Sequence, residues 1–243
     1  MSIGIPSIPY EFPGLSEEEE DEEWIEISDY LYLKKIIFLG HELDDEITND
    51  ILAILYFFDH TNIETFTNNQ NQTNETTYNR NKKKSNSNDI WFYINSQRDK
   101  SLNGFDTLSN GLAIYNSMEL IESTEITTYC VGIAATPASL LLAAGEPGKR
   151  LAVSYSRIVI NNARSSILGQ AAALDIQLKE DYIFYNIITT IYAECTGKTK
   201  NKIKQDMKSK LSLSAQEAKD YGFIDEIILD SNSPFFSITK KKK

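Results

Sequence analysis

The sequence predicts an α/β fold built on a parallel sheet, and three observations support this prediction. Short apolar, β-prone runs recur along the chain, at residues 36–39, 90–94, 127–131, 157–160 and 224–229. Helical segments separate these runs, and strands that alternate with helices form βαβ units with parallel strands. Finally, 41% of the 243 residues are hydrophobic, which is enough to fill the core of one large domain.

The two ends of the chain differ in charge from the middle. Residues 1–23 contain three prolines and then seven consecutive acidic residues at 17–23, so we expect a disordered acidic leader without the basic and apolar regions of a signal peptide. Residues 24–229 form the predicted domain. Residues 230–243 end in four lysines and are predicted to be a solvated basic tail.

The first strand and helix of the domain precede a long polar insertion. Residues 36–39 read Ile-Ile-Phe-Leu and stop at Gly40, which indicates a buried strand. Asp44 or Asp45 can cap the next helix, whose apolar residues share one face: Ile47, Ile51, Ile54, Leu55 and Phe58. Residues 62–89 are rich in Asn, Thr, Ser and Lys and are predicted to be a disordered insertion.

The rest of the domain alternates between strands and helices. After the strand at 90–94 and a loop to residue 110, we expect helices at 111–121 and 139–144 and strands at 127–131 and 157–160. Residues 170–195 form one long helix with an apolar stripe too broad for a single docked face, so neighbouring subunits are expected to bury part of it. A capping box from Ser214 to Glu217 opens the last helix, which ends at Gly222.

Composition and motifs exclude several classes of function. The net charge of −11 argues against non-specific binding to nucleic acid, and the absence of 18 consecutive apolar residues argues against a membrane span. Cys130 and Cys195 lie far apart in apolar segments and are expected to be buried thiols rather than a disulfide framework. No metal-ligand spacing, P-loop or dinucleotide fingerprint is present, so no metal or cofactor is expected.

Short motifs in a fixed order resemble those of the proteolytic subunit (ClpP) of the caseinolytic, or Clp, protease family. They include Ile-Ile-Phe-Leu-Gly at 36–40, Tyr-Ile-Asn-Ser at 93–96, Gly-Ile-Ala-Ala at 132–135, Ser-Arg-Ile at 156–158, Gly-Gln-Ala at 169–171 and Leu-Ser-Ala-Gln-Glu-Ala at 213–218. The resemblance covers residues from about Trp24 to Leu229 and is broken by the polar insertion. It implies a ClpP/crotonase-like fold in which residues 170–195 form the long handle helix. It also implies heptameric rings that stack and that bind an AAA+ Clp unfoldase.

The resemblance also implies that the catalytic residues are missing. Such proteases use a serine nucleophile, a histidine base and an aspartate that orients the histidine. The serine follows Gly-x-Ala-Ala, where this chain has Thr136, and the histidine follows the Ser-Arg-Ile strand, where it has Asn161. The aspartate is expected three residues after Gln170, where it has Ala173. The oxyanion hole is altered too, because Arg98 and Asp99 replace a glycine pair, and Pro137 has no N–H to donate.

The sequence therefore predicts a non-catalytic ring subunit of the ClpR type, which assembles with an active Clp peptidase subunit and its unfoldase in protein quality control. Two alternatives stay open. One is a rewired peptidase that uses Thr136, although neither His41 nor His60 lies on an element expected at the site. The other is a crotonase-like acyl-CoA enzyme. The Asn-rich insertion resembles those of apicomplexan parasites, so the predicted location is the stroma of a plastid, the apicoplast.

Overall fold

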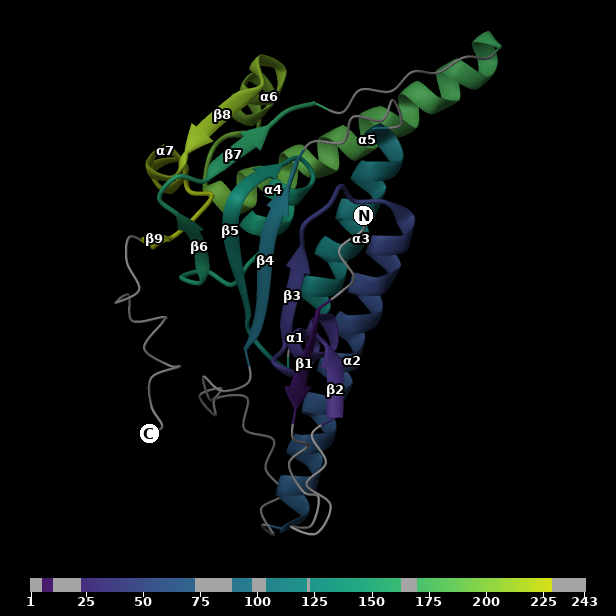
Figure 1. Ribbon diagram of the computed structural model, residues 1–243. Helices are drawn as coiled ribbons and strands as arrows, with labels where there is room; N and C mark the ends of the chain where they lie inside the picture. Colours follow the sequence, from purple (N-terminus) through teal and green to yellow (C-terminus); the bar gives the residue numbers. More distant parts are fainter. Residues whose placement is uncertain are drawn as a thin grey trace.

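The computed structural model describes residues 6–10, 23–72, 89–97, 104–121, 123–162 and 170–228. A seven-stranded sheet forms its centre (Figure 1). Five strands run in the spatial order β3 (Ile36–Leu39), β4 (Ile90–Ser96), β5 (Ile126–Ala135), β6 (Arg150–Val153) and β9 (Glu226–Ile228), and all neighbours along this path are parallel. β7 (Arg157–Ile160) pairs in parallel with the end of β5 and antiparallel with β8 (Leu211–Ser214).

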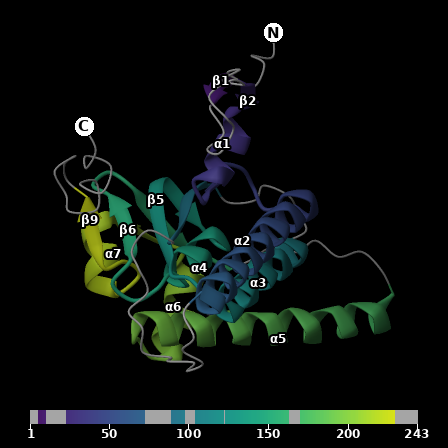
Figure 2. The ribbon, with the colours of Figure 1, turned by 90° about the horizontal axis from the view of Figure 1, so that it is seen from below.

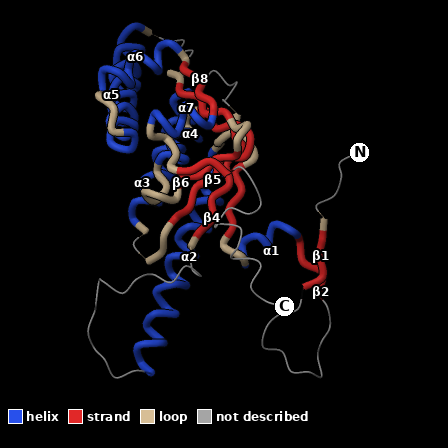
Figure 3. Tube along the Cα trace, turned by 90° about the vertical axis from the view of Figure 1, so that its left-hand side faces the viewer, coloured by secondary structure: helices blue, strands red, loops and turns tan. Residues whose placement is uncertain are grey.

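The helices gather mainly on one face of this sheet (Figures 1 and 2). They are α2 (Asp45–Gln72), α3 (Gly104–Leu120), α4 (Ala138–Ala143), α5 (Ala171–Thr196), α6 (Lys200–Ser209) and α7 (Ala215–Tyr221). Seen from the side, α1 (Ile27–Leu33) and a hairpin of β1 (Ser7–Tyr10) and β2 (Glu23–Glu26) stand apart from that helical layer (Figure 3). The predicted α/β fold with a parallel sheet is therefore confirmed.

The core lies between the sheet and the helices. Alternation along β4 turns Ile90, Phe92 and Ile94 toward the helices, and all three are fully buried. Every residue of α4 is buried, because this short helix packs between β5, α3 and α5. Shortening a core leucine such as Leu141 to alanine removes contacts on all sides and costs about 2–5 kcal/mol.

The local signals predicted at helix ends are present. Asp44 caps α2, since its carboxylate accepts a hydrogen bond from the backbone N–H of Ile47 at 2.8 Å. Ser214 and Glu217 form the predicted capping box of α7, and Gly222 ends that helix in the left-handed conformation at φ 102°. Gly197 ends α5 in the same way at φ 68°.

Three boundaries differ from the predictions. Residues 7–10 of the predicted leader form β1, because pairing with β2 satisfies their backbone groups, while residues 11–22 lie outside the described residues. α2 continues to Gln72, although residues from 62 onward were predicted to be a disordered insertion, since each added helical residue extends an existing hydrogen-bonded ladder. Residues 73–88 of the predicted insertion lie outside the described residues. α3 begins at Gly104 instead of residue 111, and β6, α6 and β8 were not predicted.

Candidate functional site

Thr136 lies where β5 turns into α4. β5 ends at Ala135, and Pro137 occupies the N-cap position of α4. The backbone N–H of Thr136 donates to the carbonyl of Val159 at 3.1 Å, so this turn is tied to the neighbouring strand β7. The side chain is 6% exposed. The fold therefore brings Thr136 next to the end of β7, as a nucleophile and its base would require.

The hydroxyl of Thr136 belongs to a buried network of hydroxyl and amide groups. Its Oγ1 lies 3.3 Å from the hydroxyl of Tyr192 and 3.4 Å from Oγ of Ser139, and it accepts the backbone N–H of Asn161 at 3.2 Å. Ser139 and Tyr192 are themselves 2.8 Å apart. Burial raises the pKa of Tyr192 to about 12. A phenol that stays protonated at neutral pH cannot take a proton from Thr136.

Asn161 is the residue that directly follows β7. It is 4% exposed, and its side-chain Oδ1 has no hydrogen-bond partner in the structure. Its contact with Thr136 is made by the backbone N–H. The carboxamide neither gains nor loses a proton near neutral pH, so this side chain cannot replace a histidine base.

The structure does not bring Ala173 to this site. Ala173 and Tyr192 both belong to the continuous helix α5, and the hydroxyl of Tyr192 touches Thr136. A separation of 19 helical residues, from 173 to 192, corresponds to about 28 Å along the axis. The expectation that this position held an orienting aspartate is therefore wrong.

Sequence reasoning missed Lys210, which the strand register places beside Asn161. β7 and β8 are antiparallel, and their last pair is Ile160 with Leu211, so Asn161 directly follows and Lys210 directly precedes the two residues of this pair. Lys210 ends α6 in the left-handed conformation at φ 54° and is exposed. An acidic residue that oriented a base at position 161 would fit here, where this chain has a cation. Only the non-local pairing of β7 with β8 reveals this neighbour.

The structure describes some of the remaining predicted site residues but not others. Arg98 and Asp99 lie outside the described residues. His41 is exposed just after β3 and His60 is exposed in α2, and neither is among the hydrogen-bond partners of Thr136. Within the described ranges, no group of three or more His, Cys, Asp or Glu side chains is arranged to hold a metal ion. None of the described helices has the length and apolar character of a membrane span.

Comparison with known proteins identifies the family. A family profile described as Clp protease matches residues 78–231, which is more than half of the chain. The chain belongs to the Clp protease family. It is 32% identical over 231 residues to the ATP-dependent Clp protease proteolytic subunit of Chlorella vulgaris, covering 95% of this chain and 98% of that protein.

Two cyanobacterial relatives are likewise similar over nearly the whole chain. The chain is 36% identical over 228 residues to the ATP-dependent Clp protease proteolytic subunit 1 of Gloeobacter violaceus, covering 94% of this chain and 98% of the relative. It is 34% identical over 229 residues to the proteolytic subunit 2 of Prochlorococcus marinus, covering 94% and 97%. The family resemblance stated from the sequence motifs is confirmed.

Proposed function

We propose that this chain is a catalytically inactive, ring-forming subunit of a Clp-type ATP-dependent protease complex. Its role is to assemble as a heptamer, to stack on or mix with an active Clp peptidase subunit, and to shape the degradation chamber or the docking of the AAA+ unfoldase. The single observation that carries the proposal is the environment of Thr136. Among the described residues, its hydroxyl contacts two hydroxyl groups, a backbone N–H and the backbone carbonyl of Val159, and none of these is a base near neutral pH.

The chemistry around Thr136 supports the inactive assignment in two further ways. Pro137, which follows Thr136, offers no N–H to an oxyanion, and loss of one such donor costs a factor of about 10²–10³ in rate. Lys210 adds positive charge beside Asn161, where an imidazolium formed during acyl transfer would need a negative partner. Thr136 is therefore proposed to have a structural role, connecting β5, β7 and α5.

The surface of α5 supports assembly. Its first two-thirds carry five large apolar side chains that are 42–63% exposed in the single chain: Ile176, Leu178, Tyr182, Ile183 and Ile187. The N-terminal end of α5 extends past the rest of the domain (Figure 2). Exposed apolar side chains at this density mark an interface with another protein. We therefore assign α5 to the contact between subunits, as the handle helix.

The face of the sheet opposite the helices supports an unfoldase partner. Tyr129, Leu151 and Ile228 form a small apolar cluster there, and Trp91 and Tyr93 pack against it. The rings of Tyr93 and Tyr129 lie 5.0 Å apart, and those of Trp91 and Tyr93 are stacked at 6.4 Å. Tyr129, Leu151 and Ile228 are themselves buried, whereas Trp91 and Tyr93 are partly exposed, and such aromatic rings can anchor apolar side chains of a partner. The docking of the unfoldase is proposed to use this face.

A plastid, and more narrowly the apicoplast, is the proposed location. The relatives include proteins of the green alga Chlorella vulgaris, the fern Adiantum capillus-veneris and two cyanobacteria. The Asn-rich composition of residues 62–89 adds the apicomplexan part of the proposal. Fluorescence imaging of the tagged full-length gene product would test the location, and a signal outside the plastid would refute it.

The inactive assignment is tested with the purified chain. We expect no turnover of fluorogenic peptides or small peptide esters and no labelling of Thr136 by a phosphonate probe for serine hydrolases, because none of the described partners of its hydroxyl is a base. An active relative treated in parallel serves as the positive control. Turnover that disappears in a Thr136→Ala variant would instead establish the alternative, a rewired peptidase.

A further inference from the structure

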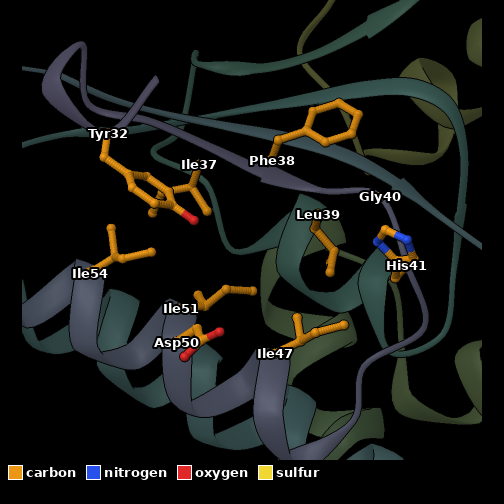
Figure 4. Close-up of a pocket in the computed structure, with 10 residues that line it drawn as sticks. All are labelled: Tyr32, Ile37, Phe38, Leu39, Gly40, His41, Ile47, Asp50, Ile51 and Ile54. Carbon is orange, nitrogen blue, oxygen red and sulfur yellow. The ribbon is translucent and has the colours of Figure 1, made fainter. Parts of the chain in front are cut away.

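A second feature lies at the β3 edge of the sheet, two strands from β5, the strand that ends just before Thr136. A pocket of about 150 Å³ opens between β3 and α2, and we name it the β3–α2 pocket. Its walls are Ile37 and Leu39 of β3, Asp50, Ile51 and Ile54 of α2, and Tyr32 of α1 (Figure 4). A volume of this size accommodates one large apolar side chain.

The surroundings of the β3–α2 pocket suit an extended peptide. β3 is the last strand on its side of the sheet and pairs only with β4 among the described strands, so one row of its backbone groups is open to an added strand. Tyr32 directs its hydroxyl into the pocket, whereas Phe38 points to the other side of β3 (Figure 4). An added strand can therefore pair with β3 and insert alternate side chains beside it.

The charge of this region is acidic. Residues 41–50 carry five acidic side chains and no lysine or arginine, and Asp50 lies in the pocket wall. The nearest basic residues in the sequence, Lys34 and Lys35, precede the other end of β3. A ligand that combines a large apolar side chain with nearby positive charges would match both the pocket and its rim.

One segment of this chain has that combination. Residues 234–243 read Pro-Phe-Phe-Ser-Ile-Thr followed by four lysines. In an extended segment Phe236 and Ile238 fall on the same side, and the lysines follow directly. The described chain ends at Ile228 in β9, which is the edge strand opposite β3.

We propose that residues 234–243 of one copy dock into the β3–α2 pocket of the neighbouring copy. The segment adds as a strand to β3, places Phe236 in the pocket and sets its lysines against the acidic residues of positions 42–50. Within one chain the segment would first have to cross four strand spacings, about 19 Å, and then turn around the sheet edge. In a ring built from one repeated contact, different surfaces of neighbouring subunits meet, and β9 of one copy can face β3 of the next. The inference rests on the proposed ring assembly.

Photo-crosslinking in the full-length chain tests the contact. A benzophenone amino acid replaces Phe236, and isotopically light and heavy chains are mixed before irradiation. We expect crosslinks between light and heavy chains that map to Tyr32, Ile51 or Ile54. An Asp50→Lys variant should lower their yield several-fold, whereas Tyr155→Ser, at a fully exposed site on the β6–β7 turn, should not. Crosslinks confined to single chains, or to other surfaces, would overturn the proposal.

A binding measurement separates failure of the pocket from failure of the ring. The receptor is the full-length chain with Phe235→Ala and Phe236→Ala, whose own segment lacks the anchor, and the ligand is a fluorescent peptide of residues 231–243. Saturable binding is expected, weakened about tenfold by Phe236→Ala in the peptide and weakened further by salt. Saturable binding to a monomeric receptor would support the pocket even if no ring forms. Equal binding of a scrambled peptide, or none to a ring, would refute it.

Discussion

At the scale of single residues, contacts from several elements hold Thr136 in the fold. Its backbone N–H bonds to β7, and its hydroxyl accepts from Asn161 and touches Tyr192. Each of these contacts satisfies a buried polar group, which would cost about 1–3 kcal/mol if left unpaired. We infer that selection on packing, rather than on chemistry, suffices to explain a threonine here.

Reconstruction of a triad is predicted to fail while Pro137 is present. We expect no peptide turnover from Thr136→Ser, Asn161→His and Ala173→Asp combined, because residue 173 is remote and the oxyanion donor is missing. A second triple variant carries Lys210→Asp in place of Ala173→Asp. This variant has a carboxylate beside position 161, yet peptide turnover should still be absent.

Adding Pro137→Ala to the set with Lys210→Asp tests the oxyanion argument, since it restores a backbone N–H. Turnover of a fluorogenic peptide should then become detectable, whereas adding Pro137→Ala to the set with Ala173→Asp should not produce turnover. Full activity from either triple variant with Pro137 intact would contradict the explanation.

Asp225 is predicted to make stability depend on pH. Burial alone would raise its pKa, but hydrogen bonds from Arg150 and Gly148 outweigh burial and hold the pKa below its ordinary value. A lowered folded-state pKa means that the contribution is complete above the unfolded value, about 3.9, and is lost as pH falls through the folded value. Asp225→Asn should lower the free energy of unfolding by about 1–3 kcal/mol at pH 7 and flatten its decline in acid.

Urea unfolding between pH 3 and pH 7 measures this effect. Asp175→Asn is the matched control, because Asp175 forms an exposed ion pair with Lys179 that contributes about 0–1 kcal/mol. An Asp225→Asn protein whose stability follows the same pH curve as the parent would contradict the assignment.

At the scale of secondary-structure elements, the residues that cap helices were easier to predict than the lengths of the helices. The capping box of α7 is a local motif, and both of its hydrogen bonds are present: Ser214 accepts from the N–H of Glu217, and Glu217 accepts from the N–H of Ser214. By contrast, α6 buries only Ile203, Asp206 and Met207, which is too few to produce a clear periodic pattern among its lysines. Its existence depends on packing against α5 and β8.

Ser214→Ala should lower stability through loss of this cap. The expected cost is about 1 kcal/mol, since the N–H of Glu217 loses its acceptor. Thermal unfolding would show a fall in Tm of a few degrees for a domain of this size. Ser212→Ala, at an exposed position of β8, is the control and should change Tm by less than half as much.

At the scale of the whole molecule, apolar surface is concentrated where contacts between proteins are proposed. The exposed apolar side chains of α5 belong to the helix, whereas the partly exposed rings of Trp91 and Tyr93 belong to β4, on the face of the sheet opposite the main helical layer. These surfaces are distinct, so the proposed contact between subunits through α5 leaves Trp91 and Tyr93 available for the proposed unfoldase contact.

Leu178→Asp together with Ile183→Asp should prevent assembly without unfolding the subunit. Both side chains are at least 55% exposed, so the cost to the isolated chain should stay within about 0.5 kcal/mol per site. Native mass spectrometry should show a ring for the parent chain and smaller species for the variant, while circular dichroism stays unchanged. A ring of normal mass from the variant would exclude α5 as the required interface.

Much of the fold could be predicted because its signals are local. The strand at 36–39 is a continuous apolar run, although Phe38 is exposed, and α5 was located within one residue at each end by its apolar length and Gly197. β6 was missed because its four residues, Arg-Leu-Ala-Val, become a strand only by pairing with β5 and β9. A short stretch of sequence contains no information about the free energy that pairing with distant strands contributes.

The amino-acid order alone was enough to predict the α/β class and the family, and it is the basis for proposing exchanged residues at positions 136, 137 and 161, because each depends on neighbours in the chain. Tertiary structure was needed to separate Ala173 from Thr136, to set Lys210 beside Asn161 and to open the β3–α2 pocket. The physical reason is that strand register and helix packing bring together residues that no local pattern relates.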